Sequence, residues 1–97
     1  MKPQTRQPVH PGGILRRQYQ EPLAISVSHL AVALKVSRKT VSKLVNEHGS
    51  VTPDMALRLS VAFDTTAELW MNLQRNHDLW KAAHETNGWK DVRKIAA

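Results

Sequence analysis

Two short apolar stripes, separated by a break of two residues, constrain the fold of this chain more than any other feature of its sequence. Each stripe repeats at intervals of three and four residues, as one face of an α-helix requires. A serine, a favourable N-cap residue, precedes each stripe. The stripes are Val27, Leu30, Ala31 and Leu34, after Ser26, and Val41, Leu44 and Val45, after Ser37. The pattern predicts a helix-turn-helix at residues 27–46, with the small Ala31 where the two helices cross.

Three further helices are expected around this pair. The first begins at Pro11 and ends at Glu21-Pro22, because proline disfavours helical geometry in the residue before it. Thr52-Pro53-Asp54 provides the cap and the first turn of another. The longest extends from about residue 67 to residue 85 and ends before Asn87-Gly88. Since no segment alternates as a β-strand would, the sequence predicts an all-α fold of five helices with a longer C-terminal helix.

The chain of 97 residues has room for one modest core. We expect a flexible N-terminal arm at residues 1–8, a helix-turn-helix domain at residues 9–86 and a C-terminal tail at residues 87–97. No apolar stretch is long enough to cross a membrane, and the first residues lack the apolar segment of a secretory signal. The expected location is the cytoplasm, and the absence of cysteine agrees with a reducing compartment.

Positive charge is concentrated in the first half of the chain. Residues 1–46 contain eight basic side chains and one acidic side chain, a net charge of +7, whereas residues 47–97 have a net charge of −1. A lysine-rich surface exposed to solvent would explain such a bias, and so would a polyanionic partner that meets the first half.

Of these two explanations, the outward face of the second predicted helix in the pair supports a polyanionic partner. Once its apolar stripe faces inward, this face consists of Ser37, Arg38, Lys39, Thr40, Ser42, Lys43 and Asn46. It is cationic, rich in hydroxyl groups and free of acidic residues. Arginine and lysine donate hydrogen bonds to guanine O6 and N7, while hydroxyl groups and a helix N-terminus suit phosphate oxygens. We therefore expect this helix to enter the major groove of double-stranded DNA. Two core helices with a solvated basic face are the structural alternative.

Five histidines raise a competing class, an enzyme or a metal protein. They are His10, His29, His48, His77 and His84. No two of them are four residues apart, the HExxH motif is absent, and no cysteine joins them. Neither a glycine-rich phosphate loop nor a G-x-S-x-G nucleophile motif occurs. The sequence predicts a protein that is not an enzyme and has no catalytic residue, cofactor or metal. A stoichiometric metal in the purified protein would contradict this.

Several separate motifs, in a fixed order, resemble the HigA-type antitoxins of the XRE, or lambda-repressor-like, class of helix-turn-helix proteins. They are HPGGIL (10–15), EPL (21–23), SRKTVS (37–42), TPDMALRL (52–59) and ELWMNLQ (68–74). The resemblance covers about residues 8–81. Lys35 departs from the family, which usually has glycine in the turn, so this lysine is expected to adopt a left-handed or otherwise less favourable backbone at modest cost.

The resemblance implies a sequence-specific repressor that dimerises, binds a palindromic operator in its own promoter and neutralises a HigB-like toxin, an mRNA interferase. It implies contacts to base edges by Arg38, Lys39, Thr40 and Lys43, with Thr40 against a thymine methyl group. The implied phosphate contacts are Ser28, Ser37, Ser42, Asn46 and Lys35.

Dimerisation would place two recognition helices one DNA turn apart, roughly 34 Å. We expect the interface on the last predicted helix, where Trp70 is assigned to the core and Trp80 to either core or interface. Two alternatives stay open. One is a stand-alone XRE-type regulator without a toxin partner, and the other is a protein-interaction module whose basic face is incidental.

Overall fold

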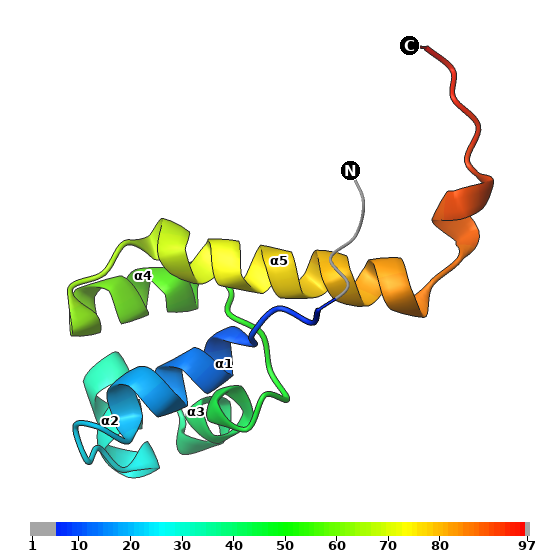
Figure 1. Cartoon of the computed structure of the whole chain (residues 1–97). Coiled ribbons are helices and arrows are strands. Elements are labelled where there is room, and N and C mark those ends of the chain that lie inside the picture. Colours follow the sequence, from blue (N-terminus) through cyan, green and yellow to red (C-terminus); the bar gives the residue numbers. More distant parts are fainter. Residues whose placement is uncertain (1–5, 97) are drawn as a thin grey trace.

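The computed structural model describes residues 6–96, and most of these residues are helical (Figure 1). The elements in order are α1 (Pro11–Ile14), η1 (Leu15–Gln20), α2 (Val27–Leu34), α3 (Arg38–Val45), α4 (Pro53–Phe63), α5 (Ala67–Glu85) and η2 (Gly88–Asp91). α1 and η1 together form the first expected helix, so the prediction of an all-α fold with five helices, the last of them longest, is confirmed. Of the predicted N-terminal arm, residues 1–5 lie outside the described part of the chain.

Side-chain caps begin the helices where the sequence placed them. Four hydroxyl oxygens each accept a hydrogen bond from the backbone N–H three residues later, at 3.0–3.2 Å: those of Ser26, Ser37, Thr52 and Thr66. Each bond satisfies an N–H group that has no partner within its helix. Thr65, the residue before the cap of α5, accepts a hydrogen bond from the Trp70 indole at 2.8 Å.

Two helices differ in detail from the expectation. η1 is a π-helix, in which the Glu21 N–H donates to the Arg16 carbonyl at 2.9 Å. The sequence pattern did not reveal this widening, because the six residues of η1 are too few for apolar spacing to distinguish a π-helix from an α-helix. α5 ends through the Thr86 hydroxyl, which donates to the Ala82 carbonyl at 2.6 Å, rather than through Gly88.

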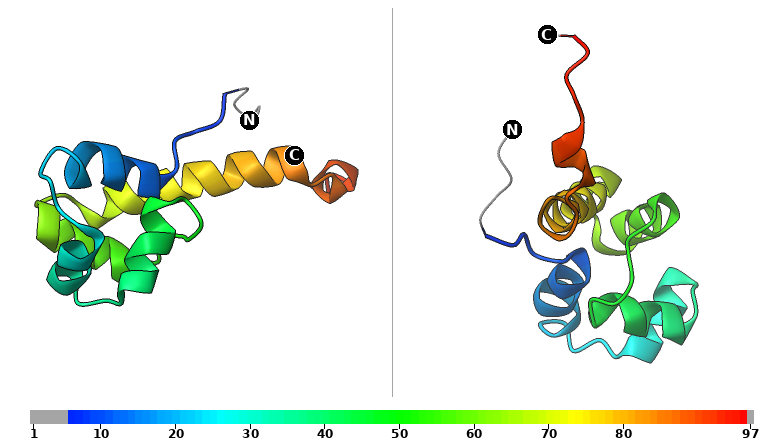
Figure 2. Two further views of the ribbon diagram at one scale, coloured as in Figure 1. Left: turned by 90° about the horizontal axis from the view of Figure 1, so that it is seen from below. Right: turned by 90° about the vertical axis from the view of Figure 1, so that its right-hand side faces the viewer.

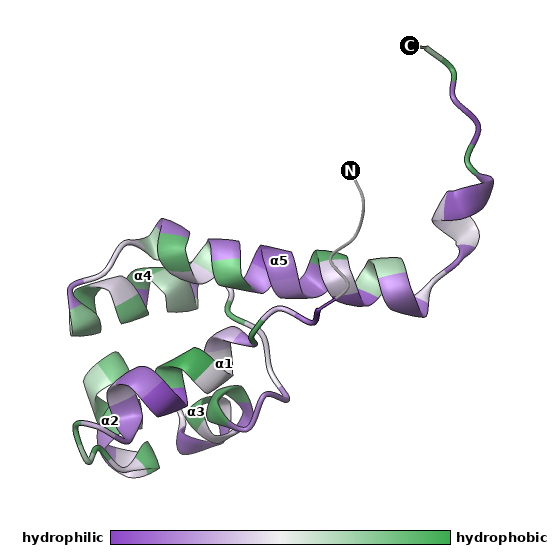
Figure 3. Ribbon diagram, in the orientation of Figure 1, coloured by the Kyte–Doolittle hydropathy of each residue, from purple (hydrophilic) through white to green (hydrophobic). Residues whose placement is uncertain are grey.

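The core lies where α5 and α4 pack over α1, α2 and α3. Its buried apolar residues are Leu15, Leu30, Ala31, Leu34, Val41, Leu44, Val45, Val51, Met55, Ala56, Leu59 and Trp70. Trp70 is fully buried, as the sequence predicted, and Ala31 is buried in the same core. Figure 3 shows apolar and polar residues interleaved along α4 and α5, so each helix contributes one face to this core.

The backbones of α1 and α3 approach each other very closely at Gly12. A β-carbon built on Gly12 would lie 1.7 Å from the carbonyl oxygen of Leu44 in α3. Because no side chain fits in that space, glycine is required here for the close approach of two helices. The contact sets how deeply α3 sits against the rest of the domain.

The molecule is elongated because α5 extends beyond the core. Its principal extents are 50 × 21 × 21 Å and its radius of gyration is 15.9 Å, against about 13 Å for a compact domain of 100 residues. After residue 85 the chain continues on the side of α5 away from α2 and α3 (Figure 2). Within residues 6–96, no helix has both the length and the apolar character needed to cross a membrane.

Candidate nucleic-acid interface

The turn between α2 and α3 has the left-handed residue that the sequence predicted. Lys35 adopts φ 58° and ψ 45°, and its N–H donates to the Val32 carbonyl at 3.2 Å. The Val36 N–H donates to the Ala31 carbonyl at 3.0 Å, which closes the end of α2. Lysine therefore replaces glycine in this turn without disturbing the geometry of the two helices.

Arg58 of α4 holds this turn in place, a role that sequence reasoning missed. Its Nη1 donates to the carbonyl oxygens of Leu34 and Lys35, at 2.9 and 3.1 Å. Its Nε donates to Asp54 at 2.7 Å, which orients the guanidinium group. The positive charge lies at the C-terminal end of α2, where the helix dipole favours a cation. Only the pairing with Asp54, four residues earlier, was visible in the sequence.

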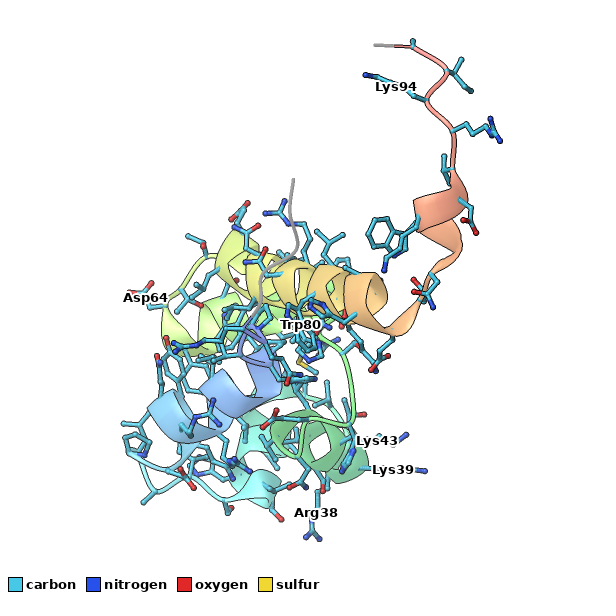
Figure 4. The ribbon with its side chains drawn as sticks, turned by 45° about the vertical axis from the view of Figure 1, so that its right-hand side comes forward. Arg38, Lys39, Lys43, Asp64, Trp80 and Lys94 are labelled. Carbon is cyan, nitrogen blue, oxygen red and sulfur yellow. The ribbon has the colours of Figure 1, made fainter. Side chains whose placement is uncertain are left out.

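The cations of α3 project into solvent, as the sequence predicted for its outward face. Arg38, Lys39 and Lys43 are exposed and extend away from the body of the domain (Figure 4). Their helix buries Val41 and Leu44 on the opposite side. No acidic side chain occurs within α3 itself, so the exposed face has one sign of charge. This is the arrangement that a recognition helix needs.

The polar residues beside these cations differ in what their atoms already contact. Ser28 and Lys35 are exposed. The Ser37 hydroxyl accepts from the Thr40 N–H and is 2.8 Å from the Thr40 hydroxyl, so both side chains help to start α3. The Asn46 amide donates to the Ser42 carbonyl at 2.8 Å. The structure thus groups all the predicted residues around the two helices, with Ser37, Thr40 and Asn46 partly engaged in local hydrogen bonds.

An open groove lies between the starts of α2 and α3. It is lined by Val27, Arg38, Lys39 and Ser42. Val27 is half-buried and packs against the core. Sequence reasoning assigned Val27 to the apolar stripe alone, because a stripe does not show that its edge residue faces the same side as the cations of the next helix.

His10 and His77 contact each other and form a histidine corner next to the loop that follows α3. His10 is buried: its Nδ1 accepts from the Gly12 N–H at 2.9 Å, and its Nε2 lies 3.0 Å from the Gly49 carbonyl. The two rings meet edge to face at 4.8 Å. Burial, reinforced by His77, lowers the pKa of His10 below 6.5, against the opposing effects of the Gly49 carbonyl, Glu47 and Asp78. The corner joins α1, the loop after α3, and α5.

A second groove runs along α5, and none of the residues that line the first groove belongs to it. It is lined by Met71, Gln74, Arg75, Asp78, Leu79 and Ala82. Gln74 is buried and fixes the chain after α3, since its Oε1 accepts from the Val51 N–H at 2.7 Å. Leu79 is 63% exposed. Trp80, for which two roles were open, is half-buried and stacks on His84 with ring centroids 4.1 Å apart.

Comparison with known proteins identifies the family. A sequence model of the helix-turn-helix family matches residues 16–70. YbaQ of Escherichia coli strain K12, named as an uncharacterized HTH-type transcriptional regulator, is 41% identical over 95 residues, which cover 98% of this chain and 84% of the relative.

Two solved structures are similar over nearly the whole chain. Antitoxin GraA in complex with its operator has a TM-score of 0.87 and 40% identity, and the match covers 100% of both chains. Antitoxin HigA of Pseudomonas aeruginosa with the higBA promoter has a TM-score of 0.83 and 41% identity, over 93% of this chain and 100% of the other. The chain therefore belongs to the helix-turn-helix family, and within it to the group that includes the antitoxins HigA and GraA.

Proposed function

We propose that this protein is a sequence-specific repressor that binds double-stranded operator DNA in the cytoplasm, a binding function without catalysis. The observation that carries the proposal is the exposed, acid-free face of α3, with Arg38, Lys39 and Lys43 directed away from the domain. GraA and HigA, which share the fold, are seen with an operator and a promoter. α3 enters the major groove, and Lys35 and Arg58 set its angle to α2.

The proposed roles of the side chains follow from their exposure and their partners. Arg38, Lys39 and Lys43 donate to base edges, and Thr40 lies beside them at the start of α3. The phosphate contacts come from the rim of this face: Ser28, Lys35, Ser37, Ser42 and Asn46. Asn46 uses its amide nitrogen within α3, so its contact to a phosphate requires that this hydrogen bond be exchanged.

The active form in this proposal is a homodimer. One chain presents a single recognition helix, whereas a palindromic operator has two half-sites about 34 Å apart. The groove on α5, with the exposed Leu79 among its lining residues, supports an interface on this helix. Two copies that meet there leave both α3 helices free to contact DNA.

We further propose that the protein is the antitoxin of a two-component module and neutralises a HigB-like mRNA interferase. The support is its group, which includes the antitoxins GraA and HigA. A stand-alone regulator is the second candidate, because YbaQ, a transcriptional regulator, matches at the same level of identity. DNA binding is common to both candidates.

The first experiment measures binding of the purified protein to its own upstream DNA and to a random duplex of equal length over a range of salt concentrations. We expect tight binding to the upstream fragment that resists a random competitor and weakens with salt, because cations displaced from phosphates are released on binding. Equal binding to both duplexes would support the interaction module and overturn the proposal.

The toxin is tested by co-expression with the products of the adjacent genes. A partner that co-purifies with the protein, and that degrades mRNA only in its absence, supports the antitoxin. If no adjacent product binds or is inhibited while operator binding persists, the protein is a stand-alone regulator.

A further inference from the structure

The groove between α2 and α3 combines features that a purely ionic DNA contact does not require. Of its four lining residues three are polar, yet the surface that they present to the groove is predominantly apolar. The Val27 side chain and the aliphatic stems of Arg38 and Lys39 account for this character. The groove opens beside the cations proposed to meet base edges, so it would be pressed against the floor of the major groove.

Val27 is held rigidly at this place. It is the first residue of α2, directly after the N-cap Ser26, whose hydroxyl accepts from the His29 N–H at 3.0 Å. One side of Val27 packs against the core, which leaves the side chain half-buried. A β-branched side chain has few χ1 rotamers, and packing restricts it further. Its methyl groups therefore form a fixed apolar wall, suited to shape recognition.

We propose that Val27 is a specificity-determining residue that recognises the 5-methyl group of a thymine at the base pair beside those read by Arg38 and Lys39. Thymine is the one standard DNA base with a methyl group in the major groove, and apolar contact is how proteins detect it. Thr40, which the family resemblance places against a thymine methyl group, does not line this groove, so the contact inferred for Val27 is a separate one. The inference rests on the proposed binding of operator DNA.

The test replaces each thymine of the operator, one at a time, with deoxyuridine. The substitution removes only the 5-methyl group and leaves base pairing with adenine unchanged. We expect the natural protein to bind about fourfold more weakly when the thymine that faces Val27 is replaced, the effect of one methyl group withdrawn from an apolar contact. The Val27→Ala variant is expected to bind the thymine and uracil duplexes almost equally at that position.

Val32→Ala is the matched control, because Val32 is on the same helix, is 76% exposed and lies outside the groove. It should retain the fourfold preference for thymine. For each variant, the dissociation constant of the uracil duplex is divided by that of the thymine duplex. Partial unfolding of Val27→Ala would raise both constants by the same factor and would leave this ratio unchanged. Val27→Thr, which keeps the shape and exchanges one methyl group for a hydroxyl, should reduce the ratio as well.

The outcomes separate this inference from the proposed function. If the protein prefers its operator but Val27→Ala keeps the natural ratio at every uracil position, the role of Val27 is overturned and operator recognition stands. If the natural protein binds operator and random DNA equally, both are overturned.

Discussion

Arg38 is the first residue of α3, and its exposed guanidinium group has no acidic neighbour within the helix. We expect Arg38→Ala to weaken operator binding by about 1–3 kcal/mol and to relax the preference at one base pair, because a bidentate contact to guanine is lost. Titration of the operator and of its single-base variants measures both effects.

Arg93→Ala is the control for this prediction, since it removes the same charge from the exposed C-terminal segment. It should leave operator binding nearly unchanged. An equal, small loss from both variants on specific and random DNA would mean that Arg38 contributes only general charge.

His10 makes stability depend on pH. Its pKa is lowered in the folded protein because the ring is buried, beside His77, and because Nδ1 must stay unprotonated to accept from the Gly12 N–H. The unfolded chain therefore binds more protons than the folded one below about pH 6.5. The free energy of unfolding should not depend on this group above pH 6.5 and should fall as the pH drops below it.

Urea unfolding between pH 5 and 8 measures this dependence. His10→Asn keeps an acceptor at the cap of α1 but cannot titrate, so its stability should decline less steeply below pH 6.5. Glu47 and Asp78 oppose the lowered pKa, and they are unchanged in this variant. His48→Asn, at an exposed histidine, should retain the natural slope. If His10→Asn also retains it, His10 is not the group responsible.

At the scale of elements, the crossing of α1 and α3 depends on Gly12. Gly12→Ala would place a methyl group against the Leu44 carbonyl, which is backbone and cannot rotate away. We expect the free energy of unfolding to fall by about 1–3 kcal/mol, the usual cost of overpacking. Gly88→Ala is the matched control, because nothing lies within 4 Å of its β-carbon position. Thermal unfolding of the two variants tests this; equal melting temperatures would show that the helices separate without cost.

At the scale of the whole molecule, the groove along α5 should hold the dimer together. Leu79→Glu places a charge among its lining residues, and we expect the dimer, of twice the chain mass of 10.9 kDa, to become a monomer. Light scattering after size-exclusion chromatography measures the mass. Leu23→Glu is the control, since Leu23 is 60% exposed, much like Leu79, but lies in the loop before α2. A dimer that survives Leu79→Glu would place the interface elsewhere.

The sequence by itself determined the helices, their caps and the charged face of α3. These features depend on neighbours within one or two turns, such as Ser37 with Thr40, and local spacing therefore predicts them. Burial of Trp70 followed in the same way, from an apolar stripe, whereas the unfavourable backbone of Lys35 was implied by the glycine that the resembled family usually has in this turn. The family resemblance added the expectation that Arg38 contacts base edges. Binding measurements test that expectation.

Only the tertiary structure decided which residues from distant segments meet. Three contacts join residues that are more than twenty positions apart in the chain: Gly12 with Leu44, Arg58 with the turn after α2, and His10 with His77. Nothing in the spacing of such residues distinguishes a contact from a coincidence, because packing and not local backbone geometry brings them together. Val27 illustrates the difference: the sequence places it on an apolar stripe, and the packing of α2 against α3 places it beside Arg38 and Lys39.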